Sequence, residues 1–386
     1  MPQYKGVIKS KLPKAGTTIF TIMSGLANET GAINLSQGFP NFEVAPKLIE
    51  LYYKALKAGH NQYAPMQGVM SLRERIAAKM EDRFSAIYNP EKEITITAGG
   101  TQAIYTAIAA VIQEGDEVIV FEPAYDSYVP AIELAGGRAI HVHLHPPDYR
   151  INWNEVKKLV NQRTKMIMIN TPQNPSGSIL TAKDMIQLEK ITASSDIIVL
   201  SDEVYEHIIF DGYEHQSVAR FPALAERSFI IYSFGKTFHA TGWKMGYCVA
   251  PEQLMAEFRK VHQFQVFSVN TPLQHALAEF MSDKNNYSGL EKFYQEKRDY
   301  FLKLLKGSKF KALPCYGSYF QLLDFKKLST MKDTEYAIKL TKENGVASIP
   351  VSVFYNVPVD NSLLRFCFAK DNETLEKAAE KLCAIS

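Results

Sequence analysis

The chain has 386 residues, of which 46% are hydrophobic, enough for one large core or two domains of a globular protein. Its net charge of +2, from 43 basic and 41 acidic residues spread without blocks, gives no reason to expect a nucleic acid or a membrane as partner. The four cysteines lie far apart with no Cys-x-x-Cys spacing, which argues against a zinc site or a disulfide framework. No apolar run approaches the ~20 residues of a membrane span and no signal peptide is recognisable, so we expect a cytoplasmic protein.

The first 40 residues form an arm of mixed character that ends at Gly38-Phe39-Pro40, a sequence typical of a tight turn where a backbone comes close to something. The residues alone leave open whether this turn approaches a ligand. An irregular loop around Tyr63 follows, and loops with an exposed tyrosine are often functional. Ser71 to Glu74 then fits a capping box at the start of a helix.

Seven short apolar runs alternate with helix-length segments in the middle of the chain. They cover residues 93–97, 117–121, 139–144, 166–170, 197–201, 228–233 and 244–249. Continuous apolar runs separated mostly by helices predict a three-layer α/β/α fold, with a mainly parallel seven-stranded sheet covered on both faces. Because ligands bind beyond the carboxyl ends of the strands in such sheets, the residues after each run are candidates for a site.

The residues after the first two runs suit an anion and a flat ring. Gly99 and Gly100 open a helix that continues through Thr101 and Gln102, and free N–H groups at a helix start favour a phosphate. A dinucleotide fingerprint is excluded, because no two glycines of the chain lie two positions apart. Tyr125 would offer an aromatic face at the edge of the sheet, although a packing role also accounts for it.

Polar residues also follow the fourth and fifth runs. Asn174 lies between Pro172 and Pro175, which would hold its amide rigidly at the site. Asp202 ends an otherwise apolar run, and a buried carboxylate is costly unless a cation such as a protonated pyridine nitrogen meets it. Tyr205, three positions on, points to the same side if a helical turn begins there.

Ser233 and Lys236 follow the sixth run, and Lys244 lies close by in the sequence. A P-loop is excluded because it needs a glycine at position 230, where isoleucine stands. Ser233 and Lys236 also fit the Ser-x-x-Lys pattern of penicillin-recognising hydrolases, but the companion motifs are imperfect. The third possibility is a lysine that forms a Schiff base with an aldehyde cofactor, while Ser233 and Lys244 hold that cofactor's phosphate.

The chain changes character near residue 286, where charged helices give way to short apolar runs. A last helix has Leu375, Ala378, Ala379 and Leu382 on one face, which predicts a smaller α/β domain. We therefore divide the chain into residues 1–40 (an arm and part of the small domain), a large domain 41–285 and a small domain 286–386. Arg365 is the only charge in its apolar run, and it would meet either the carboxylate of a ligand or a structural ion-pair partner.

His141, His143 and His145 alternate within one run, so their imidazoles would share one face of an edge strand. Such an arrangement could suggest zinc. No carboxylate or cysteine cluster accompanies the three histidines in the sequence, so we expect no metal site.

Together these motifs resemble the fold-type I pyridoxal 5'-phosphate (PLP) aminotransferases of class I/II, and the match runs from about Gly16 to the C-terminus. The resemblance implies that Lys236 binds the cofactor covalently and later moves the substrate's α-proton. It implies that Asp202 pairs with the pyridinium nitrogen, that Tyr205 and Asn174 bind the ring's phenolic oxygen, and that Tyr125 stacks on the ring.

The same resemblance implies the remaining contacts. The phosphate would be held by Gly100, Thr101, Gln102, Ser233 and Lys244. Tyr63 would reach that phosphate from the other subunit, which implies a homodimer. Arg365 would clamp the substrate's α-carboxylate, and further substrate contacts would come from Gly38, Asn174, Phe20 and Tyr63.

Within the family, Asn34 to Pro40 and Thr241 to Tyr247 look most like the kynurenine and methionine aminotransferase branch. Where the kynurenine enzymes carry a tryptophan and a histidine, this chain has Phe20 and Ser268, which favours methionine. With Phe267 as a further aromatic, we expect ping-pong transfer from an apolar, thioether or aromatic amino acid to a 2-oxo acid. The alternatives are a kynurenine- or glutamine-type transaminase with cysteine-conjugate β-lyase activity and, from another class, the Ser-x-x-Lys hydrolase.

Overall fold

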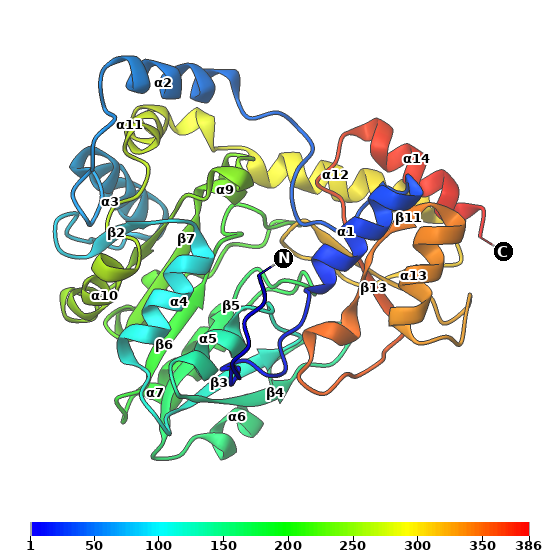
Figure 1. The fold of residues 1–386 in the computed structure, drawn as a ribbon, viewed down its shortest axis with the longest axis horizontal. Coiled ribbons are helices and arrows are strands. Elements are labelled where there is room, and N and C mark those ends of the chain that lie inside the picture. Colours follow the sequence, from blue (N-terminus) through cyan, green and yellow to red (C-terminus); the bar gives the residue numbers. More distant parts are fainter. Residues whose placement is uncertain (1, 386) are drawn as a thin grey trace.

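The structure, a computed structural model that describes residues 2–385, arranges the seven apolar runs in one sheet (Figure 1). The order across the sheet is β2-β8-β7-β6-β5-β3-β4, and only β8 runs antiparallel to its neighbours. The predicted α/β fold with a mainly parallel seven-stranded sheet is confirmed. The strands are β2 (Ile94–Thr97), β3 (Glu117–Glu122), β4 (Arg138–His143), β5 (Thr164–Asn170), β6 (Ile198–Asp202), β7 (Ser228–Ser233) and β8 (Gly246–Val249).

Helices cover both faces of this sheet, which explains why its strands are apolar without alternation. All residues of β3 and of β6 are buried. Successive side chains of a strand point to opposite faces. Ile119 accordingly joins the core beneath α3 (Met70–Phe84), whereas Val118 and Val120 join the core beneath α4 (Gly100–Val111).

The other helices of this part of the chain are short to medium in length. They are α2 (Pro46–Lys57), α5 (Tyr128–Leu134), α6 (Trp153–Leu159), α7 (Ala182–Thr192), α8 (Pro222–Ala225), α9 (Phe234–Thr237), α10 (Glu252–Gln265) and α11 (Thr271–Phe280), with 3-10 turns at Val218–Arg220 and Thr241–Trp243. Figure 1 shows α4 and α5 on one side of the sheet and α3 at its β2 edge.

The start of α3 differs from the sequence prediction. The helix begins at Met70 after Val69, which provides no side-chain cap, so the predicted capping box from Ser71 is wrong. The preceding loop fixes the entry instead, because Arg73 Nε donates to Gly68 O at 3.0 Å and Val69 N donates to Gln274 Oε1 at 2.8 Å. Long-range contacts here replace the local cap that the sequence suggested.

The C-terminal part is built on an antiparallel sheet of order β12-β13-β10-β9. Its strands are β9 (Lys311–Ala312), β10 (Phe320–Asp324), β12 (Ile349–Pro350) and β13 (Leu363–Cys367), and its helices are α12 (Leu290–Leu304), α13 (Asp333–Asn344) and α14 (Asn372–Cys383), with 3-10 turns at Lys284–Asn286, Leu305–Gly307 and Val351–Phe354. The buried residues of α14 are the four predicted from its apolar face. The domain boundaries at residues 40 and 285 stay a prediction.

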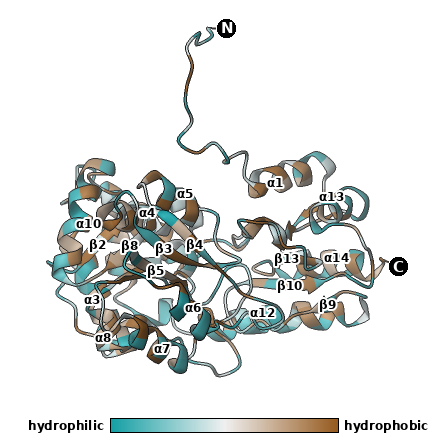
Figure 2. Cartoon of the chain, turned by 90° about the horizontal axis from the view of Figure 1, so that it is seen from below, coloured by the Kyte–Doolittle hydropathy of each residue, from teal (hydrophilic) through white to brown (hydrophobic). Residues whose placement is uncertain are grey.

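The N-terminal segment joins this C-terminal part rather than the large sheet. α1 (Ile19–Thr30) lies beside α13, and β1 (Ile33–Asn34) pairs in parallel with β11 (Val346–Ala347). Residues 2–18 form neither helix nor strand, and Figure 2 shows this arm leading away from the rest of the chain. Across residues 2–385, no helix combines the length and the apolar character needed to cross a bilayer.

Candidate active site

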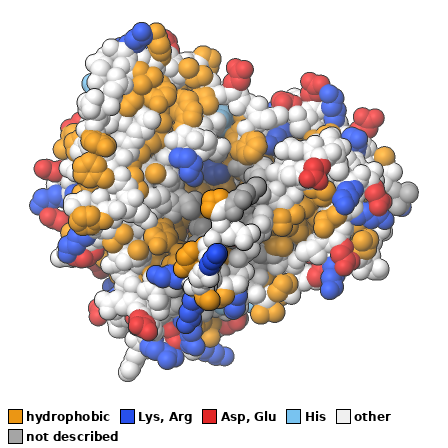
Figure 3. Space-filling model, in the orientation of Figure 1, with side chains coloured by type: hydrophobic (Ala, Val, Ile, Leu, Met, Phe, Trp, Pro, Cys, Tyr) orange, Lys and Arg blue, Asp and Glu red, His pale blue; other side chains and the backbone are white. Residues whose placement is uncertain are grey.

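A cavity of about 290 Å³ lies at the carboxyl ends of the large sheet's strands, closed from the other side by α1, β10 and β13. Figure 3 shows the corresponding hollow in the middle of the surface, with basic side chains at its edge. All predicted site residues except Gln102 and Tyr63 line the cavity: Phe20, Gly38, Gly100, Thr101, Tyr125, Asn174, Asp202, Tyr205, Ser233, Lys236, Lys244 and Arg365.

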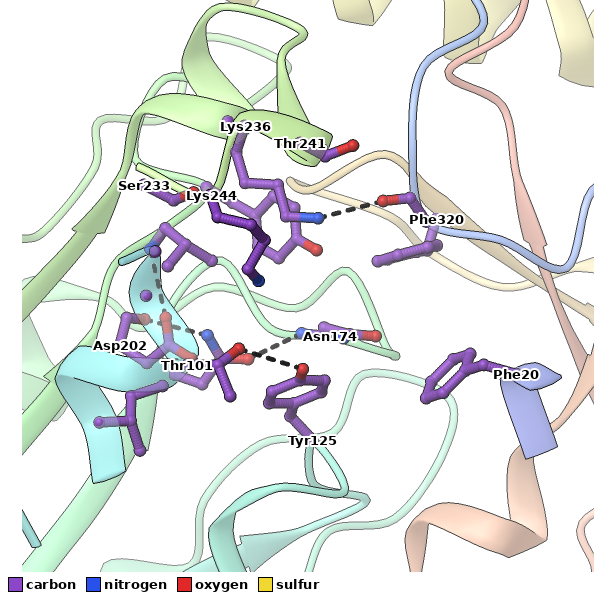
Figure 4. Close-up of a pocket in the computed structure, with 18 of the residues that line it drawn as sticks. Phe20, Thr101, Tyr125, Asn174, Asp202, Ser233, Lys236, Thr241, Lys244 and Phe320 are labelled. Carbon is purple, nitrogen blue, oxygen red and sulfur yellow. Dashed lines mark hydrogen bonds between the residues drawn. The ribbon is translucent and has the colours of Figure 1, made fainter. Parts of the chain in front are cut away.

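Lys236 enters the cavity from α9, directly after β7 (Figure 4). Its amine donates to Gly38 O at 3.0 Å and to Tyr319 Oη at 2.7 Å. Burial, together with the nearby charges of Arg365 and Lys244, lowers the pKa of Lys236 to about 8. A larger share of this amine is therefore neutral near pH 7 than in an exposed lysine, and a neutral amine can act as nucleophile or base.

Asp202 is the last residue of β6 and only 4% exposed. Its carboxylate accepts a hydrogen bond from Tyr128 Oη at 2.5 Å and one from Val204 N at 3.3 Å. Burial raises the pKa of Asp202 to about 6. Among residues 2–385 no lysine, arginine or histidine forms an ion pair with it, so the carboxylate can still take a cationic ligand group.

The start of α4 and two further side chains make an anion-binding arrangement. Gly99 precedes the helix with φ of +83°, and no side chain caps the first turn, which contains Gly100 and Thr101. Ser233 and Lys244 line the same cavity, and a Cβ placed on Gly99 would lie 3.5 Å from Lys244 Nζ. Backbone N–H groups of a helix start, a hydroxyl and an ammonium together favour a phosphate-like anion.

Arg365 projects from β13 and is 1% exposed. Its Nη1 donates to Asn174 Oδ1 and its Nη2 to Ser36 O, both at 2.8 Å, whereas Nε has no partner. The guanidinium carbon lies 3.9 Å from the ring centroid of Phe320. Within the described residues it has no ion-pair partner, so the structural ion pair that the sequence left open is not found.

Tyr125, Tyr205 and Asn174 surround the middle of the cavity. Tyr125 Oη lies 3.3 Å from Thr101 Oγ1, and Figure 4 shows its ring beside the cavity. Tyr205 follows Asp202 in a turn and lines the same space, as predicted. The backbone N of Asn174 donates to Asn170 Oδ1 at 2.8 Å, which helps fix the loop that carries it.

Two predicted residues lie elsewhere. The side chain of Gln102 contacts Ala98 N and Gln265 Oε1, both at 3.0 Å, so it faces α10 and not the cavity. The polar atoms of this side chain are used inside the chain, so the predicted phosphate contact of Gln102, which stays a prediction, would have to come from its backbone N–H in the first turn of α4. Tyr63 is 82% exposed and packs edge-on against Phe267, itself 50% exposed, with centroids 5.3 Å apart. Of the three aromatic residues expected around the substrate, only Phe20 lines the cavity within one chain.

The sequence did not reveal three residues that shape the site. Tyr128 binds the Asp202 carboxylate, and Asn170 donates through Nδ2 to Asp202 O at 2.9 Å. Tyr319 binds Lys236 from the C-terminal part. Asn170 could have been found, since it ends the fourth apolar run, whereas Tyr128 and Tyr319 carry no signal that separates them from packing tyrosines.

The three histidines of the β4 region lie at the edge of the sheet, as predicted. Glu122, however, contacts two of them, with Oε1 2.7 Å from His141 Nδ1 and Oε2 3.2 Å from His143 Nε2. The statement that no carboxylate accompanies these histidines is therefore wrong, because the neighbouring strand supplies one. In the described part of the chain, no group of three or more metal-ligand side chains is arranged to hold an ion.

Comparison with known proteins shows which family the chain resembles. Residues 30–382 match the family model described as aminotransferase class I and II. The chain is 49% identical to the methionine aminotransferase of Escherichia coli K12 over 97% of both chains, and 33% identical to human kynurenine–oxoglutarate transaminase 1, covering 92% of this chain and 93% of that one. A crystal structure from Escherichia coli, whose title identifies a methionine aminotransferase function, superposes with a TM-score of 0.96 at 49% identity, covering 97% of this chain and 99% of that chain.

Proposed function

Because the chain belongs to the class I and II aminotransferases, we propose that it is a PLP-dependent enzyme that transfers the amino group of methionine to a 2-oxo acid. The observation that carries the proposal is that four groups able to bind the parts of PLP and of an amino acid line one cavity. An anion site lies at α4, a carboxylate without a cationic partner at Asp202, a buried lysine at Lys236, and a guanidinium without a carboxylate at Arg365.

The donor set around the cavity fits PLP. Asp202 would hold the pyridine nitrogen, since its buried carboxylate has hydrogen bonds only from neutral groups. The start of α4, Ser233 and Lys244 would hold the phosphate. Tyr125 would cover the ring, and Asn174 and Tyr205 would bind its phenolic oxygen. When bound, this cofactor supplies an electrophilic carbonyl and an electron sink.

The chain's own residues would bind the substrate and move its proton. Arg365 would hold the α-carboxylate in bidentate fashion through Nε and the N–H groups of Nη1 and Nη2 that have no partner among residues 2–385. The Lys236 amine, with its lowered pKa, would take the proton from the α-carbon and return it one position away. Phe20 and Phe320 would shield this step from water on the side of the C-terminal part.

Methionine is favoured over kynurenine by the relatives and by the cavity. The identity to the methionine aminotransferase is 49%, against 33% to the human kynurenine enzyme. Phe20 supplies an apolar ring, and the cations that line the cavity already have roles at the lysine, the phosphate and the α-carboxylate. A dicarboxylic substrate would need a further cation for its side chain, so we infer an uncharged thioether side chain.

We also propose a homodimer in which Tyr63 completes the partner's site. Tyr63 and Phe267 are exposed large aromatics, and the patch of hydrophobic side chains over the α2 and α11 region is visible in Figure 3. Exposed apolar surface of this kind is common at interfaces between subunits.

We further propose a cytoplasmic location, with which the four free cysteines are compatible.

The test of the substrate proposal is a panel of amino donors with one fixed 2-oxo acid acceptor. We expect the highest kcat/KM for methionine, lower values for phenylalanine, kynurenine and glutamine, and the lowest for aspartate. A preference for kynurenine or aspartate would overturn the methionine assignment. Acylation of Ser233 by a β-lactam is not expected, since the family is that of the aminotransferases and not of the Ser-x-x-Lys hydrolases.

A further inference from the structure

Three polar atoms from distant parts of the chain form a closed triangle at the end of the catalytic lysine. Lys236 Nζ lies 2.7 Å from Tyr319 Oη and 3.0 Å from Gly38 O, and Tyr319 Oη lies 2.5 Å from Gly38 O. Tyr319 is fully buried, and Tyr205 is a further hydrogen-bonding neighbour of its hydroxyl, with the two ring centroids 5.1 Å apart. Gly38 and Tyr319 are 281 positions apart and belong to the side of the cavity opposite the large sheet.

The positions of the protons in this triangle follow from which atoms can donate and which can only accept a hydrogen bond. The Gly38 carbonyl can only accept, so Tyr319 must donate its single proton to it. The Tyr319 oxygen then has only lone pairs left to offer Lys236, and the lysine must be the donor in both of its bonds. The three distances place both acceptors in nearly the same direction from Nζ, at an angle well below the tetrahedral angle, so both acceptors lie on one side of the amine.

Hydrogen bonds to these acceptors draw N–H groups of the tetrahedral amine toward that side, which leaves one position on the side facing away from them. In the neutral amine this position is the lone pair, and in the ammonium it is the third proton. Both acceptors remain usable in either protonation state, so the amine can gain and lose a proton at that position without turning. Lys236 lines the cavity, and the remaining position is directed away from both acceptors.

We propose that Tyr319 is a positioning residue for Lys236: with Gly38 O it orients the free amine so that its proton-accepting position faces the substrate's α-carbon. The inference rests on the proposed function, since it assumes that Lys236 moves this proton. It assigns to Tyr319 a role that follows from its contacts with Lys236 and Gly38.

The close approach of Gly38 supports this assignment. A Cβ at position 38 would lie 2.7 Å from the Phe320 ring and 3.7 Å from the Tyr319 ring, so a side chain there would push the carbonyl away from both donors. The tyrosine itself is anchored on its backbone, where its carbonyl accepts from Phe368 N at 3.1 Å. Both acceptors are therefore held rigidly relative to each other.

The chain provides a matched control for the hydroxyl of Tyr319. Tyr294 lies in the same aromatic cluster, with ring centroids 5.9 Å apart, and is equally buried. Its hydroxyl has no hydrogen-bond partner among the described residues. Tyr319→Phe and Tyr294→Phe thus remove the same atom from the same cluster, but only the first removes a contact with Lys236.

The experiment compares the PLP-loaded wild type with these two variants in a single turnover with methionine and with α-deuterated methionine. For Tyr319→Phe we expect the rate of the half-reaction to fall at least tenfold and the deuterium isotope effect to rise, because proton transfer becomes more limiting, while the Kd for methionine changes less than twofold. Tyr294→Phe should match the wild type in all three quantities.

A second measurement does not depend on turnover. Competitive acetylation of the cofactor-free proteins across a pH range, read by peptide mass spectrometry, gives the pKa of the Lys236 amine. Loss of an acceptor removes support from the ammonium, so this pKa should fall in Tyr319→Phe and stay unchanged in Tyr294→Phe. Should Tyr319→Phe not fold, 3-fluorotyrosine at position 319, a weaker acceptor, must shift the rate and the pKa in the same directions.

The outcomes separate the two proposals. A Tyr319→Phe variant with wild-type rate and isotope effect would overturn the positioning role, and so would a slower variant whose isotope effect and lysine pKa are unchanged, since that pattern indicates damaged packing. A wild type that fails to react with methionine would instead refute the proposed function and leave the geometry of the triangle untouched.

Discussion

Replacement of Arg365 by methionine tests whether its guanidinium binds the substrate's carboxylate. A guanidinium has five N–H groups, and two are bonded to Asn174 and Ser36, so three remain for a ligand. A bidentate carboxylate would use two of them, each worth about 1.5–3 kcal/mol as a charge-assisted bond. The loss of about 3–6 kcal/mol corresponds to a fall of roughly 10²–10⁴ in kcat/KM.

The assay compares methionine with 3-(methylthio)propylamine, which has the same side chain and amine but no carboxylate. The wild type should strongly prefer methionine to the amine. Arg365→Met should lose most of this preference because its kcat/KM for methionine falls, while its kcat/KM for the amine stays as in the wild type. Arg365→Lys keeps a charge without the planar fork and should fall between them. The reasoning fails if Arg365→Met keeps its kcat/KM for methionine within about threefold, or keeps the preference.

The Tm of Arg365→Met is the control for this experiment. The Arg365 charge is fully buried and burial lowers its pKa to about 10, so its removal takes an unfavourable buried charge out of the apoprotein. The neighbouring Phe320 and Phe354 rings can pack on a methionine side chain. We therefore expect the Tm of Arg365→Met to equal or exceed that of the wild type, and a large fall in Tm would make the kinetic loss uninterpretable as a binding effect.

Four further predictions concern the lysine, the carboxylate and the subunit interface. Lys236→Ala should abolish turnover while circular dichroism stays unchanged, and retained activity would remove Lys236 from the mechanism. Asp202→Asn should weaken PLP binding and lower kcat at least 100-fold, measured by cofactor titration and by initial rates, because a neutral amide cannot hold a proton on the pyridine nitrogen; an equal kcat would contradict the pairing. Mixing Lys236→Ala with Tyr63→Ala subunits should restore about a quarter of wild-type activity if Tyr63 acts across the interface, since half of the dimers are mixed and each has one intact site, whereas no recovery would place Tyr63 in its own chain's site. The pKa of Lys236 in the folded protein, about 8, lies below the ordinary value of 10.5, so the unfolded chain binds more protons between these two pH values. The free energy of unfolding of the cofactor-free protein should therefore rise from pH 8 to pH 10.5. Denaturant titrations should show a smaller rise for Lys236→Met.

The sequence located the part of the site that follows from strand topology. Asn174, Asp202 and Lys236 each follow an apolar run, and parallel strands bring their carboxyl ends to one edge, so a chain-order argument finds them together. The glycine pair before α4 likewise suggests an anion site at the start of that helix. These inferences need only local pattern and the rule for parallel sheets, and the structure brings the residues they name into one cavity.

Residues whose role depends on packing between distant segments were out of reach. Tyr128 binds Asp202 across 74 positions, and Tyr319 binds Lys236 across 83. Nothing in the local sequence distinguishes these hydroxyls from that of Tyr294, which is equally buried and has no hydrogen-bond partner within residues 2–385. The orientation of the Gln102 side chain has the same origin, since α10 supplies the partner that turns it away from the cavity.

The charges that line the cavity give a reason for the binding of two anionic groups. Lys236, Lys244 and Arg365 face only one lining carboxylate, Asp202, and the two other cations are among the causes that lower the pKa of Lys236. Arg365 is buried and Lys244 is exposed, both repel a protonated Lys236, and anions placed beside Lys244 and Arg365 relieve that repulsion. A phosphate at the first and a carboxylate at the second would therefore raise the proton affinity of Lys236, so that the lysine becomes a stronger base when both groups are in place. The same residues that hold the ligands would in this way prepare the amine for the proton it must accept.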